Sequence, residues 1–83
     1  MKAKKKIKIN FKKLGREKAF GQAVSSENLI ELDPRQKQKT LLNTLIHELL
    51  HIVEPDWSEN KVRKTTSILA RYIWEAKYRR LAD

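Results

Sequence analysis

Residues 41–55 read LLNTLIHELLHIVEP, and this stretch decides the fold. Its apolar side chains recur at the i, i+4, i+7, i+11 spacing of one helix face, at Leu42, Ile46, Leu49 and Val53. Leu41, Leu45 and Ile52 widen that face, which predicts a helix buried on much of its circumference. Pro55 should end the helix at or before Glu54, because the residue before a proline disfavours helical backbone.

The segment before this helix predicts its start. Asp33 can cap the helix, Pro34 suits the first helical position, and Gln36 falls where a capping box has Glu or Gln. Further upstream, three short strands are expected before the helix. They cover Ile7–Lys12, which alternates apolar and polar residues, then Ala19–Val24, and then Leu29–Leu32.

A second helix should follow the connector Asp56-Trp57-Ser58, with Ser58 as its cap. It ends in the cationic run 77–80, which suits the helix dipole. The sequence therefore predicts an α+β fold, with a small three-stranded antiparallel sheet followed by two helices. We expect the inner face of the second helix to carry Val62, Thr66, Leu69, Ile73 and Ala76.

Length and composition limit the other possibilities. The chain has 83 residues, which corresponds to a single domain spanning 1–83, with residues 1–6 as a loose basic tail. It contains no cysteine, which excludes a disulfide scaffold and thiolate metal ligands. No apolar run is long enough for a membrane span, so we expect a cytoplasmic protein, in the host cytoplasm if phage-encoded. The net charge of +9 is concentrated at the two ends, and a basic balance of this size is typical of nucleic-acid binding.

The chemistry is expected at His47-Glu48-Leu49-Leu50-His51, which matches H-E-x-x-H. Residues i and i+4 lie one helical turn apart on the same face, so His47 and His51 can converge on one metal ion, with zinc expected. Glu48 lies about 100° around the helix, beside the metal rather than on it. There it can act as general base toward the water that zinc activates. Both histidines of the chain fall at the required spacing.

A catalytic zinc site needs a third protein ligand, and three acids are available. Glu54 follows the motif on the same helical face, Asp56 lies in the connector, and Glu59 begins the second helix. We favour Glu59, which can approach from across the site, while Glu54 and Asp56 stay open. Tyr72 and Arg63 are candidates to stabilise an oxyanion, although a structural or solvated role suits each better.

The segment Leu29–Val62 resembles the small zincin-like metallopeptidases found in phages and bacterial mobile elements. The similarity rests on residues 29–35 (LIELDPR), 44–51 (TLIHELLH) and 58–62 (SENKV), and is most specific in the central helix. This resemblance implies a compact sheet, a metal-binding helix and a second helix whose start supplies the third ligand. It implies zinc ligation by His47 and His51, a base at Glu48, and an acidic ligand position at Glu59.

The expected function is zinc-dependent hydrolysis of peptide bonds, with a peptide or protein substrate lying along the third strand by β-addition. The alternative is a non-enzymatic protein that zinc only stabilises and whose basic ends bind nucleic acid or an acidic protein partner. Unchanged hydrolysis by a zinc-binding Glu48→Gln variant would exclude the first function. Salt-dependent nucleic-acid binding that survives removal of Glu48 would favour the second.

Overall fold

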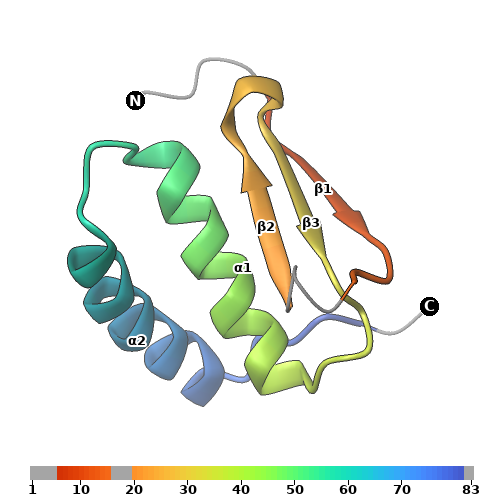
Figure 1. The fold of residues 1–83 in the computed structure, drawn as a ribbon. Coiled ribbons are helices and arrows are strands. Elements are labelled where there is room, and N and C mark those ends of the chain that lie inside the picture. Colours follow the sequence, from red (N-terminus) through yellow and green to blue (C-terminus); the bar gives the residue numbers. More distant parts are fainter. Residues whose placement is uncertain (1–5, 16–19, 82–83) are drawn as a thin grey trace.

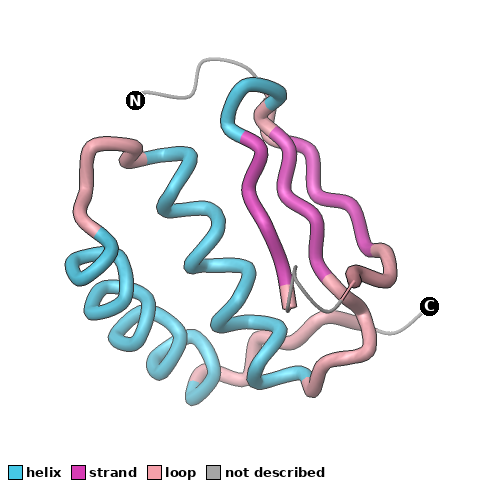
Figure 2. Tube along the Cα trace, viewed as in Figure 1, coloured by secondary structure: helices cyan, strands magenta, loops and turns pink. Residues whose placement is uncertain are grey.

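The computed structural model describes residues 6–15 and 20–81 and confirms the predicted α+β fold class, with three strands followed by two helices (Figure 1). The sheet, α1 and α2 form successive layers, with α1 in the middle (Figure 2). Residues 1–5 of the predicted tail and Ala19 of the second predicted strand lie outside the described residues. In chain order the elements are β1 (Lys8–Phe11), β2 (Gly21–Val24), a 3₁₀ turn (Ser25–Glu27), β3 (Leu29–Leu32), α1 (Gln38–Val53) and α2 (Glu59–Glu75).

The sheet is mixed, which corrects the expectation of a purely antiparallel one. Its strand order is β1-β3-β2, in which β2 pairs antiparallel with β3 and β1 pairs parallel with β3. The physical reason is that β3 carries the most apolar sequence and takes the central position, where Ile30 and Leu32 are fully buried. The connection between β1 and β2 spans residues 12–20, which is long enough to pass the end of β3.

The core lies between the sheet and α1. It is formed by Ile30, Leu32, Leu41 and Ile52, with Leu45 and Leu49 packed against it. Each fully buried side chain of this kind contributes about 1.5–3 kcal/mol. The layer between the two helices is closed by the inner face of α2, which buries Val62, Thr66 and Ala70. Leu69 is 41% exposed, so its predicted place on the inner face was wrong; the buried stripe runs through Ala70 instead.

The start of α1 differs from the prediction. The helix begins at Gln38, with Lys37 as its cap residue, so Asp33 does not cap it. Asp33 instead accepts hydrogen bonds from the backbone amides of Leu14 (3.1 Å) and Arg35 (2.9 Å). A local Asx-type turn therefore uses the carboxylate before the helix can.

The other helix boundaries follow the sequence. α1 ends at Val53, and Glu54 is its C-cap residue, directly before Pro55. Ser58 caps α2, because its Oγ accepts a hydrogen bond from the amide of Lys61 at 3.1 Å. Among the described residues, no helix combines the length and apolar character that crossing a membrane requires.

Candidate metal centre

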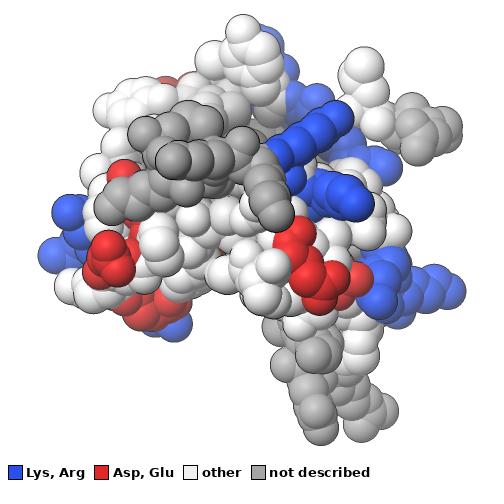
Figure 3. Space-filling model, turned by 90° about the horizontal axis from the view of Figure 1, so that it is seen from above, with Lys and Arg blue, Asp and Glu red and all other residues white. Residues whose placement is uncertain are grey.

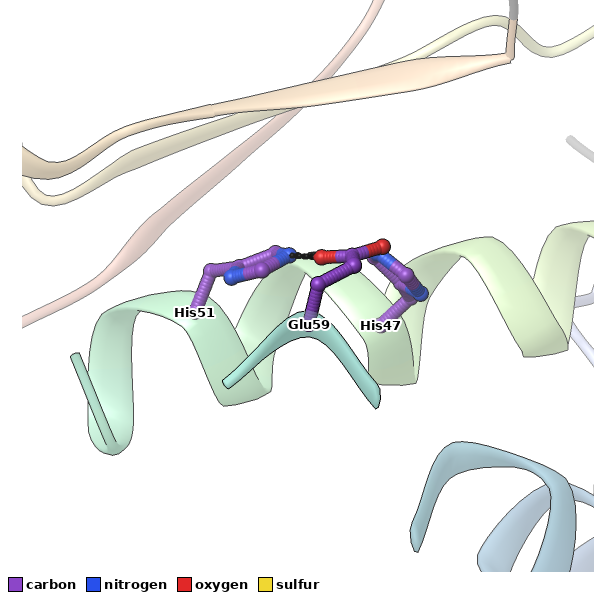
Figure 4. Close-up of side chains that lie close together, drawn as sticks. All are labelled: His47, His51 and Glu59. Atoms are coloured by element: carbon purple, nitrogen blue, oxygen red, sulfur yellow. Dashed lines mark hydrogen bonds and ion pairs between the residues drawn. The ribbon is translucent and has the colours of Figure 1, made fainter. Parts of the chain in front are cut away.

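His47 and His51 lie one turn apart on α1 and point in the same direction (Figure 4). Their Nε2 atoms are 3.1 Å apart and their ring centroids 4.8 Å apart. The two side chains are 23% and 33% exposed, so the rings are supported by packing and still accessible to an ion. Two imidazole nitrogens this close either share a proton or direct their lone pairs at a common cation.

Glu59 completes the group from the other side. It is the first residue of α2, and its carboxylate reaches across to α1 (Figure 4). Glu59 Oε1 lies 3.0 Å from His51 Nε2, and Glu59 Oε2 lies 3.3 Å from His47 Nε2. Among the described residues, His47, His51 and Glu59 form the group that could hold a metal ion. Neither Glu54 nor Asp56 belongs to it.

The separations within this triad suit a metal ion. Zinc bonds of 2.0–2.1 Å in a tetrahedral arrangement place neighbouring ligand atoms about 3.3 Å apart. The closest separations between the three side chains are 3.0, 3.1 and 3.3 Å. Two imidazoles and one carboxylate form the donor set of many catalytic zinc sites, in which a fourth position is open to water or substrate. The residues present therefore fit the ion that the motif implies.

Arg63 supports Glu59 from the next turn of α2. Its Nε donates a hydrogen bond to Glu59 Oε2 at 3.0 Å. Desolvation pushes the pKa of Glu59 upward, but the Arg63 hydrogen bond and the nearby histidines outweigh it, so the pKa is lowered. Glu59 is thus kept ionised, as a metal ligand must be. Glu59 and Arg63 have the i, i+4 spacing of an ion pair on a helix, and this spacing could have predicted their contact from the sequence.

Glu48 is half-buried on α1 beside the triad. Burial raises its pKa, the charges of His47 and His51 oppose that shift, and Glu59 adds to it. A carboxylate with a raised pKa is a better proton acceptor than an ordinary surface glutamate.

Tyr72, one of the two oxyanion candidates, lies more than three turns beyond Glu59 along α2, roughly 20 Å away by the helical rise. Arg63 is the candidate that stands near the site.

Of the three strands, β2 packs most extensively on α1, the helix that carries both histidines. A strand of the sheet passes above the triad in Figure 4. A Cβ atom on Gly21 would lie only 2.7 Å from Thr44 Cγ2, so glycine allows the close approach of β2 to α1. Thr44 stands one turn before His47. The expected substrate strand, β3, has a partner strand on both sides, so it has no open edge to offer.

Comparison with known proteins gives no relative: no protein-family model, no curated protein and no solved structure matches this chain. The structure itself supports a small α+β domain with a possible metal-binding triad of two histidines and a glutamate.

Proposed function

We propose that this chain is a zinc metallopeptidase of the H-E-x-x-H type, in which His47, His51 and Glu59 bind the ion and Glu48 is the general base. The observation that carries the proposal is the convergence of the three donors from two helices at 3.0–3.3 Å. The zincin-like resemblance of Leu29–Val62 adds to it. A packing role for the histidines alone would not require a carboxylate from α2 with one oxygen within 3.3 Å of each Nε2 atom.

A bound zinc ion would supply Lewis-acid polarisation of the scissile carbonyl and a lowered pKa of water. Glu48 then accepts the proton of the attacking water and delivers it to the leaving amine. Its partial burial suits both steps, because the raised pKa brings proton uptake and release closer to neutral pH. Arg63 holds Glu59 in place through the hydrogen bond to Oε2.

The substrate is proposed to add to β2 rather than to β3. β2 is an edge strand of the described sheet and packs on α1, the helix that carries His47 and His51. The carbonyl of Phe20 accepts a hydrogen bond from the amide of Asp33, so the backbone of Phe20 faces the chain that forms β3. Along an antiparallel strand, residues whose backbone groups face the partner alternate with residues whose backbone groups face away from it. By that alternation, the amide and carbonyl groups of Gly21 and Ala23 face the open edge. An extended peptide could pair with them and pass the metal site.

The test has two stages. Mass spectrometry of the untagged protein should find about one zinc per chain, and a His47→Ala/His51→Ala variant should lose it. Cleavage of a proteome-derived peptide library should then fall by roughly 10²- to 10⁴-fold in Glu48→Gln, which keeps its zinc. Glu54→Gln is the matched control, because it makes the same chemical change on α1's C-cap and should keep full activity. Equal cleavage by Glu48→Gln, or none by the zinc-loaded protein, would reject the peptidase.

The second candidate is the zinc-stabilised basic module that binds nucleic acid or an acidic protein, and the net charge of +9 favours it. On the face shown in Figure 3, however, lysine and arginine side chains form separate groups with acidic side chains between them. A continuous phosphate track would need an unbroken basic surface. Binding of a DNA duplex that weakens steeply with salt and is equal in Glu48→Gln would favour this candidate.

A further inference from the structure

An apolar groove of about 370 Å³ lies away from the triad, between β1 and α1. It differs from the metal centre in both position and chemistry, since neither the histidines nor Glu59 line it. The C-terminal segment after α2 passes behind the first turn of α1 toward the end of the sheet (Figure 2). Gln38 Nε2 donates to the carbonyl of Arg80 at 3.0 Å and fastens this segment to α1. The groove's apolar walls include Ile9, Phe11, Leu32, Leu41, Leu42 and Leu45.

The groove exists because α1 covers β2 and β3 more fully than β1. Ile9 and Phe11 face it and remain 41% and 39% exposed, although the alternating pattern of β1 predicts that they should be buried. Tyr78, which also lines the groove, is 70% exposed. Contiguous exposed apolar side chains of this kind mark interaction surfaces in soluble proteins.

β1 is also an edge of the described sheet. Lys8 donates its amide to the carbonyl of Asn28, and Lys12 donates to the carbonyl of Leu32, so alternate residues of β1 point at β3. The amide and carbonyl groups of Ile9 and Phe11 therefore face the opposite, open side. Their side chains meet the groove while their backbones present an edge, which is the geometry that receives an added strand.

The positive charge around the groove favours a partner that carries negative charge. Among the described residues that line the groove are Arg79 and Arg80, and none of these described residues is acidic. The guanidinium of Arg80 lies 4.0 Å from the ring centroid of Phe11, at the boundary between apolar wall and solvent. Lys8, on the same strand, is exposed. A ligand that fills this groove thus gains from apolar side chains inside it and from negative charge beside Arg80.

We propose that β1 and this groove bind an extended segment of another protein, with apolar side chains at alternate positions and an acidic side chain next to them. Alternate side chains of a strand point to the same face about 6.6 Å apart, so two of them can enter the groove together. The added strand pairs with Ile9 and Phe11, and its carboxylate lies near Arg80. This interaction does not depend on the proposed peptidase activity, because its residues are distinct from the triad and Glu48.

The test selects peptides from a random twelve-residue display library on the immobilised full chain. The proposal expects enriched peptides that combine alternating apolar residues with Asp or Glu. On binding such a peptide, the amides of Ile9 and Phe11 should become protected from hydrogen exchange. Affinity should fall at least tenfold in Ile9→Glu and about tenfold in Arg80→Glu, which reverses the charge beside Phe11 and keeps every apolar residue of the wall. Ile68→Glu is the matched control, since Ile68 is 59% exposed on α2 and outside the groove.

Several results would overturn the proposal. One is that every selected peptide binds Ile9→Glu and Arg80→Glu as tightly as it binds the wild-type chain. Another is enrichment of peptides that lack acidic residues. If the chain self-associates and Ile9→Glu abolishes that association, the occupant is a second copy rather than another protein. Peptide binding that is equal in Glu48→Gln supports a site separate from catalysis, whereas loss of binding there would assign the peptides to the metal site.

Discussion

Asp33 and Thr66 are both buried polar side chains, and they differ in the hydrogen bonds that their surroundings offer. Asp33 is surrounded by donors from Leu14 and Arg35, and the Arg35 side chain above all holds the pKa of this carboxyl well below its usual range. Thr66 is 1% exposed, and its Oγ1 has no hydrogen-bond partner among the described residues. A buried carboxylate with full pairing stabilises the fold, whereas a buried hydroxyl without a partner costs stability.

Thr66→Val should stabilise the protein by about 1 kcal/mol, because it replaces the unpaired hydroxyl with a methyl group of similar shape. Urea unfolding followed by circular dichroism measures the change. Thr65→Val is the matched control on the neighbouring, partly exposed position and should change stability by less than about 0.5 kcal/mol. A loss of stability in Thr66→Val would mean that the hydroxyl is satisfied in solution.

Asp33→Asn should lower stability at neutral pH and abolish one part of its pH dependence. The folded pKa of Asp33 is depressed below the unfolded value of 3.8, so the stabilisation is present above that pH. It is lost as the pH falls from about 4 toward the folded pKa. The difference in unfolding free energy between wild type and Asp33→Asn should therefore be constant from pH 5 to 7 and shrink below pH 4. A difference that grows in acid would contradict the assignment.

At the scale of elements, the contact between β2 and α1 depends on one glycine. Gly21→Ala should destabilise the protein by about 1–3 kcal/mol, because the new methyl would stand 2.7 Å from Thr44 Cγ2 and 3.1 Å from the carbonyl oxygen of Glu31. The second variant Gly21→Ala/Thr44→Ser removes the Thr44 methyl and keeps its hydroxyl bond to Gln36. It should recover part of the loss in thermal unfolding. No recovery would mean that the limiting contact is one of the other two, with Leu32 Cδ2 at 3.0 Å or with the carbonyl oxygen of Glu31.

The helices could be predicted further than the sheet. Helical periodicity, Pro55 and the Ser58 cap gave the end of α1 and the start of α2, because these signals are local. The start of α1 could not be read in the same way, since the hydrogen bond from the Leu14 amide to Asp33 joins distant parts of the chain. Strand order was also inaccessible: alternation gives the faces of a strand and not its neighbours.

The sequence predicted the three members of the possible metal-binding triad, and it predicted their surroundings only in part. The spacing of His47 and His51 placed them together, and Glu59 was favoured as the third donor, which the geometry supports. The substrate strand was predicted incorrectly, because the order β1-β3-β2 places a partner strand on both sides of β3. Strand order depends on tertiary packing, such as the close approach of Gly21 on β2 to Thr44 on α1, which the local sequence pattern does not reveal.

At the scale of the whole molecule, bound zinc should stabilise the fold, because the triad ties α1 to α2. Zinc at about 100 times its dissociation constant contributes roughly 2.7 kcal/mol, which corresponds to an increase in Tm of about 10–20 °C for a domain of this size. Differential scanning calorimetry with zinc and with a chelator measures it. The His47→Ala/His51→Ala variant should show no shift. An equal shift there would place the stabilising zinc elsewhere.

The three residues of the candidate metal centre lie close together in the sequence, which has a consequence for how the chain folds. His47, His51 and Glu59 belong to one hairpin of two helices joined by residues 54–58, so little loop entropy opposes their meeting. The parallel register of β1 with β3, such as Lys8 opposite Leu29, joins more distant residues. Local contacts form faster than distant ones, so the helical hairpin can assemble first and the first strand can join last. A metal ion taken up by that hairpin would act early on the folding pathway, before the sheet is complete.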